Sequence, residues 1–253
     1  MSTRETEITA STAAAAAGAT AAAAAGATAA AAATAAASAT ATATATRPAT
    51  ARGRRSRGAI VEAAADLFYA HGVAATSLDQ VLERSGAGKS QLYHYFPAGK
   101  RDLSAAVVDR QIERVLGNQP RLYAIERFTD LTTWADDVAT LHRAPGGPFD
   151  CPLGSLAAEL DRDPELRPVV AAAFQRWLAP LRDAAARLQA AGELGDAEDP
   201  DLVAERILVT LQGAMVLGRA LGDPVLMRRS LDALLAGLRP VGDADTQPPG
   251  GLG

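Results

Sequence analysis

Apolar residues recur every three to four positions along most of the chain, which is the spacing of one face of an α-helix. No segment shows sustained alternation of apolar and polar residues, the pattern of a half-buried strand, so the sequence predicts an all-α fold. Asp163-Pro164, Asp199-Pro200 and Asp223-Pro224 each resemble a helix start, with Asp as the N-cap and Pro in the first turn. The second half is expected to hold helices near residues 125–143, 153–161, 164–191, 199–221 and 223–238.

Four shorter patterns precede them. The first pattern, "A..LF", gives one apolar face and predicts a helix. This helix ends at Gly72, since glycine is typical just beyond a helix C-terminus. In "TSLDQVLERSG", Ser77 and Gln80 form a capping box that predicts a short second helix, which Gly86 ends. A third helix is expected from about 89 to 96 and a fourth from about 100 to 116.

The third of these helices lies in "SGAGKSQLYHYF", an unusual crowding of rings in a chain that is only 4% aromatic. At about 100° per residue, Leu92 and Phe96 share one face and anchor the helix to the first two. Ser90, Gln91 and His94 lie on the opposite face. Two short helices joined by a tight glycine turn, with a polar outer face on the second, are typical of a helix-turn-helix that enters the DNA major groove.

The charge distribution predicts that the segment around residues 51–100 binds a polyanion. The net charge is −4, yet residues 51–100 carry seven Lys or Arg against four acidic residues, whereas residues 101–253 carry 16 against 23. Arg52, Arg54, Arg55 and Arg57 are predicted to form a basic arm before the first helix that contacts phosphates or the minor groove.

Residues 57–103, including "IVEAAADLFYAHGVAATSLDQVLERSGAGKSQLYHYFPAGKRDL", resemble the DNA-binding domain of TetR-family transcriptional regulators. The resemblance implies base contacts from Ser90 and Gln91. It implies phosphate contacts from Thr76 or Ser77, Tyr93, His94 or Tyr95, and Lys100. We add the arginine arm and Lys89 to the predicted DNA-binding residues.

Two features depart from the commoner family pattern: Gly88 stands where a serine is usual, and "FPAGK" is one residue longer than "FPSK". This longer form and "CPLGSLAAEL" resemble the LmrA/YxaF-like branch, whose members are associated with efflux or stress genes.

The segment "ILVTLQGAMVLGRAL", residues 207–221, is apolar all round and contains one charge, Arg219. Such a helix must be covered on two sides. The resemblance implies a homodimer formed by the last two helices, and the residues expected at the interface are Leu211, Ala214, Met215 and Gly218. The alternative is a central core helix of a monomer.

Rings and aliphatic residues of the second half are candidates for an apolar effector pocket between helices. The set is Trp134, Leu141, Phe149, Phe174, Trp177 and Leu178. For any single ring, core packing is the favoured alternative, and the pocket as a whole is implied by the resemblance. The expected function is a ligand-responsive repressor; a ligand-independent architectural DNA-binding protein is the alternative.

Other features limit the function classes. No His, Cys and carboxylate spacing resembles a metal or nucleophile site, so neither an enzyme nor a cofactor is expected. Cys151 is the single cysteine, which fits a reducing, cytoplasmic compartment. It precedes a predicted helix, which leaves redox sensing and simple burial as two interpretations.

Four regions are predicted: a disordered Ala/Thr-rich tail (1–51), a DNA-binding domain (52–100), a helical ligand-binding and dimerisation domain (101–239) and a second tail (240–253).

Overall fold

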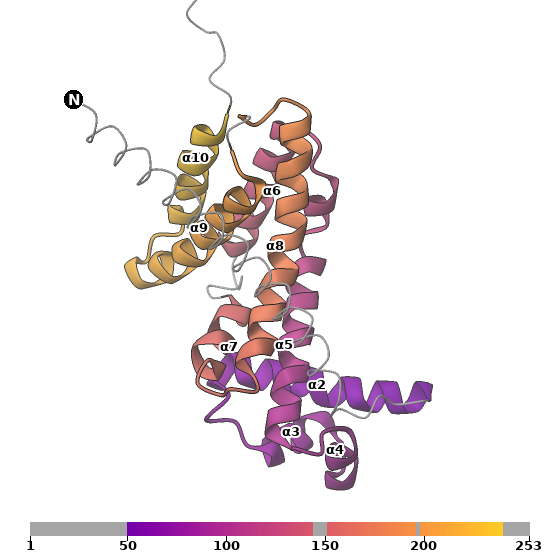
Figure 1. Ribbon diagram of the computed structural model, residues 1–253. Coiled ribbons are helices and arrows are strands. Elements are labelled where there is room, and N and C mark those ends of the chain that lie inside the picture. The colour runs from indigo at the N-terminus through magenta and orange to yellow at the C-terminus, as the bar shows by residue number, and fades with distance from the viewer. Residues whose placement is uncertain (1–49, 144–150, 196–197, 240–253) are drawn as a thin grey trace, which may run out of the picture. The chain divides into compact units, whose positions relative to one another are not determined.

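The computed structural model describes residues 50–143, 151–195 and 198–239, and within them it contains α-helices and one 3-10 helix but no strand. Nearly all of the two predicted tails, and Phe149, lie outside the described residues. The predicted all-α fold is confirmed for the described part (Figure 1). The elements are α2 (Ala51–His71), α3 (Leu78–Ser85), α4 (Lys89–Tyr95), α5 (Lys100–Gly117), η1 (Pro120–Ala124), α6 (Phe128–Arg143), α7 (Pro152–Leu160), α8 (Arg167–Ala190), α9 (Pro200–Leu221) and α10 (Leu226–Leu238).

The predicted arginine arm is not an extension before the first helix, because α2 already begins at Ala51. Thr50 is its N-cap, and the Thr50 hydroxyl accepts a hydrogen bond from the Gly53 N–H at 3.1 Å. Arginine and alanine are good helix formers, so the exposed first turns of α2 need no apolar face to be helical. The arginines therefore project from a helix.

The helix-turn-helix has the predicted caps. Ser77 and Gln80 form the capping box of α3, and Gly86 ends this helix in the left-handed conformation with φ 66°. Gly99 opens α5 with φ 64°, a conformation that favours glycine. The longer "FPAGK" turn is thus closed by a residue suited to its backbone.

Helix starts in the second half were predicted with mixed success. Asp199 caps α9 and Pro200 follows in the first turn, as expected. After Asp163 the helix begins three residues beyond Pro164, and after Asp223 it begins two residues beyond Pro224. In both places the carboxylate first accepts a hydrogen bond from the N–H two residues on and closes a turn. The short η1 was not predicted.

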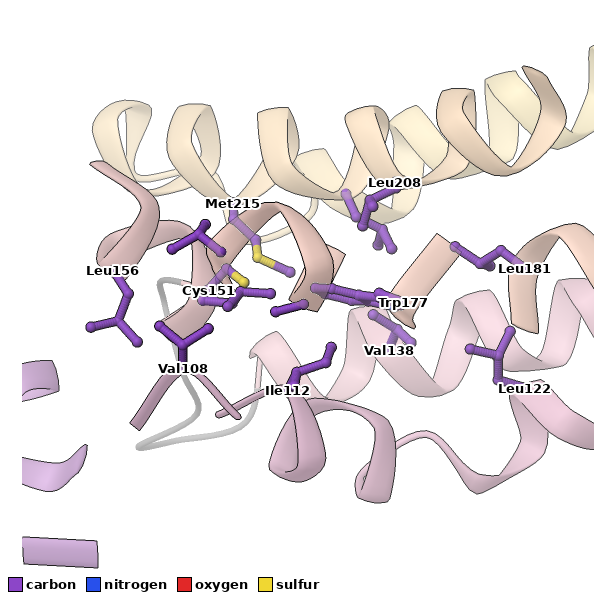
Figure 2. Close-up of a cluster of buried hydrophobic side chains, with 14 of the residues drawn as sticks. Val108, Ile112, Leu122, Val138, Cys151, Leu156, Trp177, Leu181, Leu208 and Met215 are labelled. Carbon is purple, nitrogen blue, oxygen red and sulfur yellow. The ribbon is translucent and has the colours of Figure 1, made fainter. Parts of the chain in front are cut away.

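Helices α2, α3 and α4 form an N-terminal unit, called the head below. Helix α5 lies between the head and the rest of the described chain, since it contacts both α2 and α8. Helix α9 packs against α8 and α10, and α10 also packs against α6. The buried core runs through these contacts and includes Trp134 and Trp177, each 1% exposed. Figure 2 shows Trp177 among buried side chains that include Ile112, Val138 and Leu208. No helix in the described part of the chain is both long and apolar enough to cross a bilayer.

Candidate nucleic-acid interface and effector cavity

Helix α4 presents the polar face that the sequence predicted. Leu92 and Phe96 are fully buried and hold the helix against the head. Lys89, Ser90, Gln91 and His94 are exposed, and Tyr93 is 44% exposed at the edge of this face. The amide, hydroxyl and imidazole groups therefore face outward together, as base contacts in a major groove require.

Gln91 has a second role that the sequence analysis missed. Its Oε1 accepts a hydrogen bond from the Gly88 N–H at 3.1 Å and so satisfies one of the unpaired donors at the start of α4. The serine hydroxyl that is usual at position 88 is absent, and the Gln91 side chain supplies an acceptor nearby. Its Nε2 donors are not needed for this contact.

Two predicted phosphate contacts, Thr76 and Tyr95, are buried instead. Thr76 is 2% exposed, and its hydroxyl donates to the Gly72 carbonyl at 2.8 Å, which ties the turn after α2. Tyr95 is 7% exposed and packs edge-on against Phe96. In each pair of alternatives the other residue, Ser77 or His94, is the exposed one.

The basic residues around α4 differ in their surroundings. Arg54 and Arg55 are exposed on α2. Arg57 is half-buried, with its guanidinium 5.1 Å from the centre of the Phe96 ring, so it stabilises the head by a cation–π contact. The Lys100 Nζ donates to the Ala74 carbonyl at 3.3 Å and lies across the loop between α2 and α3.

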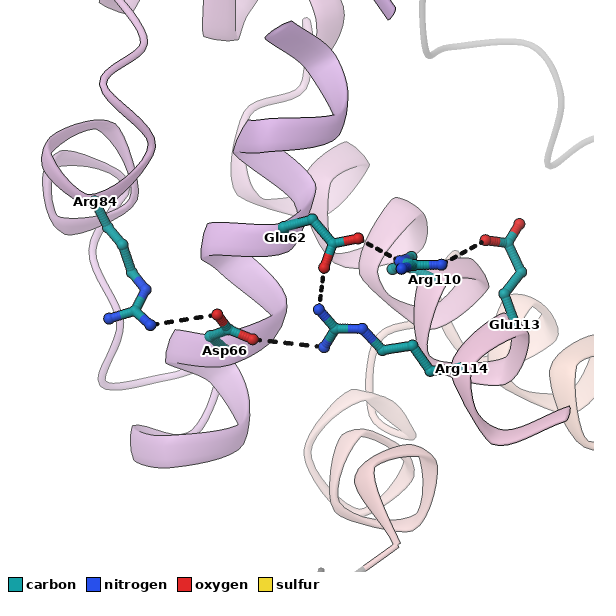
Figure 3. Close-up of polar contacts among 6 residues, drawn as sticks. All are labelled: Glu62, Asp66, Arg84, Arg110, Glu113 and Arg114. Atoms are coloured by element: carbon teal, nitrogen blue, oxygen red, sulfur yellow. Dashed lines mark hydrogen bonds and ion pairs between the residues drawn. The ribbon is translucent and has the colours of Figure 1, made fainter. Parts of the chain in front are cut away.

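An ion-pair cluster joins the head to α5 (Figure 3). Asp66 of α2 pairs with Arg84 of α3 at 3.3 Å and with Arg114 of α5 at 3.5 Å. Glu62 pairs with both Arg110 and Arg114. Each exposed pair contributes little alone, but the network links three helices and restrains their rotation.

A second link to the head comes from α7. The Glu159 Oε2 accepts a hydrogen bond from the Ala74 N–H at 3.0 Å. An added Cβ at Gly72, where φ is 84°, would lie 3.0 Å from the same carboxylate. Glu159 was not predicted, since 85 residues separate it from Ala74 and no local pattern signals the contact.

A cavity of about 240 Å³ is lined by Asp66 and Arg114 of the ion-pair cluster and by Cys151 and Pro152 at the start of α7. Helix α2 contributes Tyr69, α5 contributes Gln111, α6 contributes His142, and α9 contributes Met215. Leu141 and Trp177 also line it, so two of the six predicted ligand residues lie here. A larger hollow of about 700 Å³ shares Tyr69, His142 and Met215 with it and therefore adjoins it.

The other predicted ligand residues lie elsewhere. Trp134 is in the core, and its indole N–H donates to the Gln119 Oε1 at 3.2 Å. Phe174 lines a separate groove of about 540 Å³ between α8 and α9. Leu178 is half-buried and packs on the core. The sequence could not distinguish a ring that lines a cavity from a ring that fills the core, and ligand binding by these residues stays a prediction.

Burial sets the protonation of the cavity wall. It lowers the pKa of His142, although the Val138 carbonyl, 2.8 Å from Nδ1, opposes the shift. It raises the pKa of the Tyr69 hydroxyl. At neutral pH both groups are therefore uncharged. Gln111 is the polar residue that sequence could have revealed, because it follows Ser104 by two turns on the buried face of α5.

Cys151 is the N-cap of α7, as its position suggested, but its thiol is not activated. The Gly154 N–H and the Gln212 Nε2 each donate to Sγ at 3.3 Å. Burial raises the pKa of the Cys151 thiol despite these contacts. A buried thiol with a raised pKa favours the interpretation as a structural residue over redox sensing.

Helix α9 has two apolar faces, as predicted, but the residues expected at the interface lie on the inner one. Leu211, Ala214 and Met215 are buried within the chain. Gly218 is half-buried, and a Cβ there would lie 3.2 Å from the Asp223 carbonyl, so it serves the turn into α10. The exposed apolar and small residues of the outer face are Leu202, Val209, Gly213, Val216, Leu217 and Ala220, and the charged Glu205 and Arg206 lie between Leu202 and Val209.

Two family models match the chain. One, described as bacterial regulatory proteins of the tetR family, covers residues 60–107; the other, a tetracyclin repressor-like C-terminal domain, covers 124–234.

Relatives agree with these matches. The HTH-type transcriptional regulator LmrA of Bacillus subtilis is 32% identical over 130 residues, which is 48% of this chain and 66% of that protein. An uncharacterized HTH-type transcriptional regulator of Mycobacterium tuberculosis is 30% identical over 200 residues, 73% of this chain and 95% of that protein. The crystal structure of a TetR transcriptional regulator from Chloroflexus aurantiacus has a TM-score of 0.61 and 25% identity, covering 74% and 96% of the two chains.

Proposed function

Because the chain belongs to the TetR family of bacterial transcriptional regulators, we propose that it is a repressor that binds operator DNA as a homodimer and is released by a small apolar effector. The observation that carries the proposal is the exposed polar face of α4, set on two fully buried anchors. The expected targets are efflux or stress genes.

Base reading is assigned to Ser90 and Gln91, which lie at the start of α4 where a recognition helix meets the groove. Phosphate contacts are assigned to Lys89, Tyr93, His94 and the exposed arginines of α2, all of which are open to solvent. Thr76 and Tyr95 are left out of this surface because they are buried.

Dimerisation is assigned to the outer face of α9. Val209 and Val216 are two helical turns apart and are 70% and 66% exposed. Gly213 lies between them on the same face, where it permits close approach of a second helix. The apolar groove along Phe174 and Leu217 continues this face towards α8.

Effector control follows from where the cavity lies. One wall belongs to α2 of the head, through Asp66 and Tyr69. Another is the start of α7, whose far end holds the loop after α2 through Glu159. A ligand that separates these walls would reposition α4 relative to α9. Its effect on DNA affinity can be no larger than its preference for one arrangement over the other.

Selection of duplexes from a random pool by the full chain tests this proposal. We expect one sequence with two related half-sites about 34–36 Å apart, as a dimeric helix-turn-helix requires. Enrichment of no sequence, with binding governed by salt alone, would favour the architectural alternative and contradict a repressor. Release from the selected duplex by small apolar compounds tests the effector.

A further inference from the structure

The two tryptophans of the chain differ in one respect that bears on the ligand. The indole N–H of Trp134 has a partner, the Gln119 Oε1. The Trp177 Nε1 is also buried, but it has no hydrogen-bond partner among the described residues. A buried donor left unpaired costs about 1–3 kcal/mol, and most buried donors in native proteins are paired. Trp177 lines the 240 Å³ cavity, so a bound molecule there could supply the missing acceptor.

Gln111 is a second polar group of the cavity wall. It is 3% exposed, and its side-chain amide carries both donors and an acceptor. The cavity thus offers hydrogen-bonding groups from α5 and α8. The surrounding surface from Val115, Leu141 and Met215 is apolar.

The charged groups of the wall are already compensated. Asp66 and Arg114 pair with each other at 3.5 Å, and both have further partners outside the cavity. Tyr69, His142 and Cys151 are neutral because burial disfavours their charged forms. Among the described residues that line this cavity, a charged ligand would find no unpaired counter-ion, and it would lose its hydration, which is costly in an apolar site.

The volume of the cavity limits the size of the ligand. An apolar protein cavity of about 150 Å³ accommodates benzene. The cavity of about 240 Å³ therefore has room for one ring with a short substituent, and the adjoining 700 Å³ hollow provides space for a longer one.

We propose that the effector is an uncharged, ring-containing molecule whose carbonyl or comparable oxygen accepts a hydrogen bond from the Trp177 indole N–H. This assignment rests on the proposed function for its regulatory meaning. Binding to the cavity is measured without DNA. Failure of ligand binding is therefore distinguishable from failure of the proposed repressor function.

Three probes of nearly the same shape test the assignment on the full chain: acetophenone, isopropylbenzene and benzoate. Dissociation constants are measured by calorimetry for wild type and for Trp177→Phe, which keeps a ring and removes the N–H. We expect Trp177→Phe to weaken acetophenone roughly 5- to 30-fold, the value of one hydrogen bond of about 1–2 kcal/mol. Isopropylbenzene should change far less, and benzoate should bind more weakly than acetophenone to wild type.

The matched control is Trp134→Phe, whose N–H already has a protein partner, and it should not change the preference among the probes. A measurement that needs no change at position 177 is the indole N–H resonance in a ¹⁵N-correlated spectrum. Acetophenone should shift the Trp177 signal downfield, and isopropylbenzene should not. The proposal is overturned if acetophenone does not bind at millimolar concentration, if Trp177→Phe weakens both neutral probes equally, or if benzoate binds most tightly.

Discussion

A charge on the outer face of α9 should separate the proposed dimer, and Val216→Glu is the clearest perturbation. Val216 is 66% exposed within one chain and lies midway along the apolar stripe. In a two-fold symmetric interface the same residue is buried on both sides, so each change counts twice. Helix geometry is undisturbed, because glutamate is a better helix former than valine.

The magnitude follows from this exposure. Burying the remaining two-thirds of a valine side chain contributes about 1 kcal/mol per copy. A carboxylate without a partner in the interface costs roughly 3 kcal/mol per copy. These effects amount to about 8 kcal/mol, and water reaching the helix ends would reduce them by about half. A loss of roughly 4 kcal/mol still raises the dimer dissociation constant about a thousand-fold.

Sedimentation velocity at micromolar protein concentration measures the outcome. Val216→Glu should sediment as a folded monomer with unchanged circular dichroism, and Val209→Glu, on the same stripe, should behave alike. The control is Thr140→Glu, which places the same charge at an exposed β-branched position of α6. If the Val216→Glu chain remained a dimer at the concentrations where wild type does, the interface would have to lie on another surface.

Three further predictions address the head and the cavity. Arg54→Gln with Arg55→Gln should flatten the slope of log affinity against log salt by about 0.9 per lost phosphate contact; an unchanged slope would exclude both residues from the DNA surface. Glu159→Ala removes the acceptor for the Ala74 N–H, so it should speed hydrogen exchange at that N–H and lower the free energy of unfolding. The loss should be only roughly 1 kcal/mol, because the side chain is exposed. Glu159→Gln keeps an acceptor and should restore protection from exchange. Because burial lowers the pKa of His142, the unfolded chain binds the proton more readily, and stability should fall as pH drops below about 6.5; denaturant titrations should show a smaller fall for His142→Gln.

The recognition helix was predictable because its signals are local. A capping box, a left-handed glycine and the spacing of Leu92 and Phe96 are all encoded within about twenty residues, and the structure shows each of them. Thr76 shows the limit of this reasoning. A threonine before a helix can bind phosphate or a backbone carbonyl, and only the turn after α2 determines that its hydroxyl donates to Gly72.

The sequence could not show which face of α9 is buried, because a helix that is apolar all round has no polar face to mark the solvent side. Leu211 and Val216 are equally apolar, and only packing against α8 and α10 buries the first and exposes the second. The same reason applies to the tryptophans. Which indole N–H is paired depends on Gln119, a residue 15 positions from Trp134 whose side chain is placed by tertiary packing.

The central claim is that the outer face of α4 reads DNA sequence, and the affinity ratio between the selected duplex and a scrambled one tests it most directly. Gln91→Ala removes both the base-reading amide and the acceptor for the Gly88 N–H, whereas Gln91→Glu keeps an acceptor there. Loss of the cap alone would weaken binding to both duplexes alike. The account predicts that Gln91→Ala lowers the ratio by about 1–3 kcal/mol, roughly 5- to 150-fold, and that Gln91→Glu does not restore it. An equal loss on both duplexes, recovered by Gln91→Glu, would show that Gln91 only caps the helix and would contradict the account.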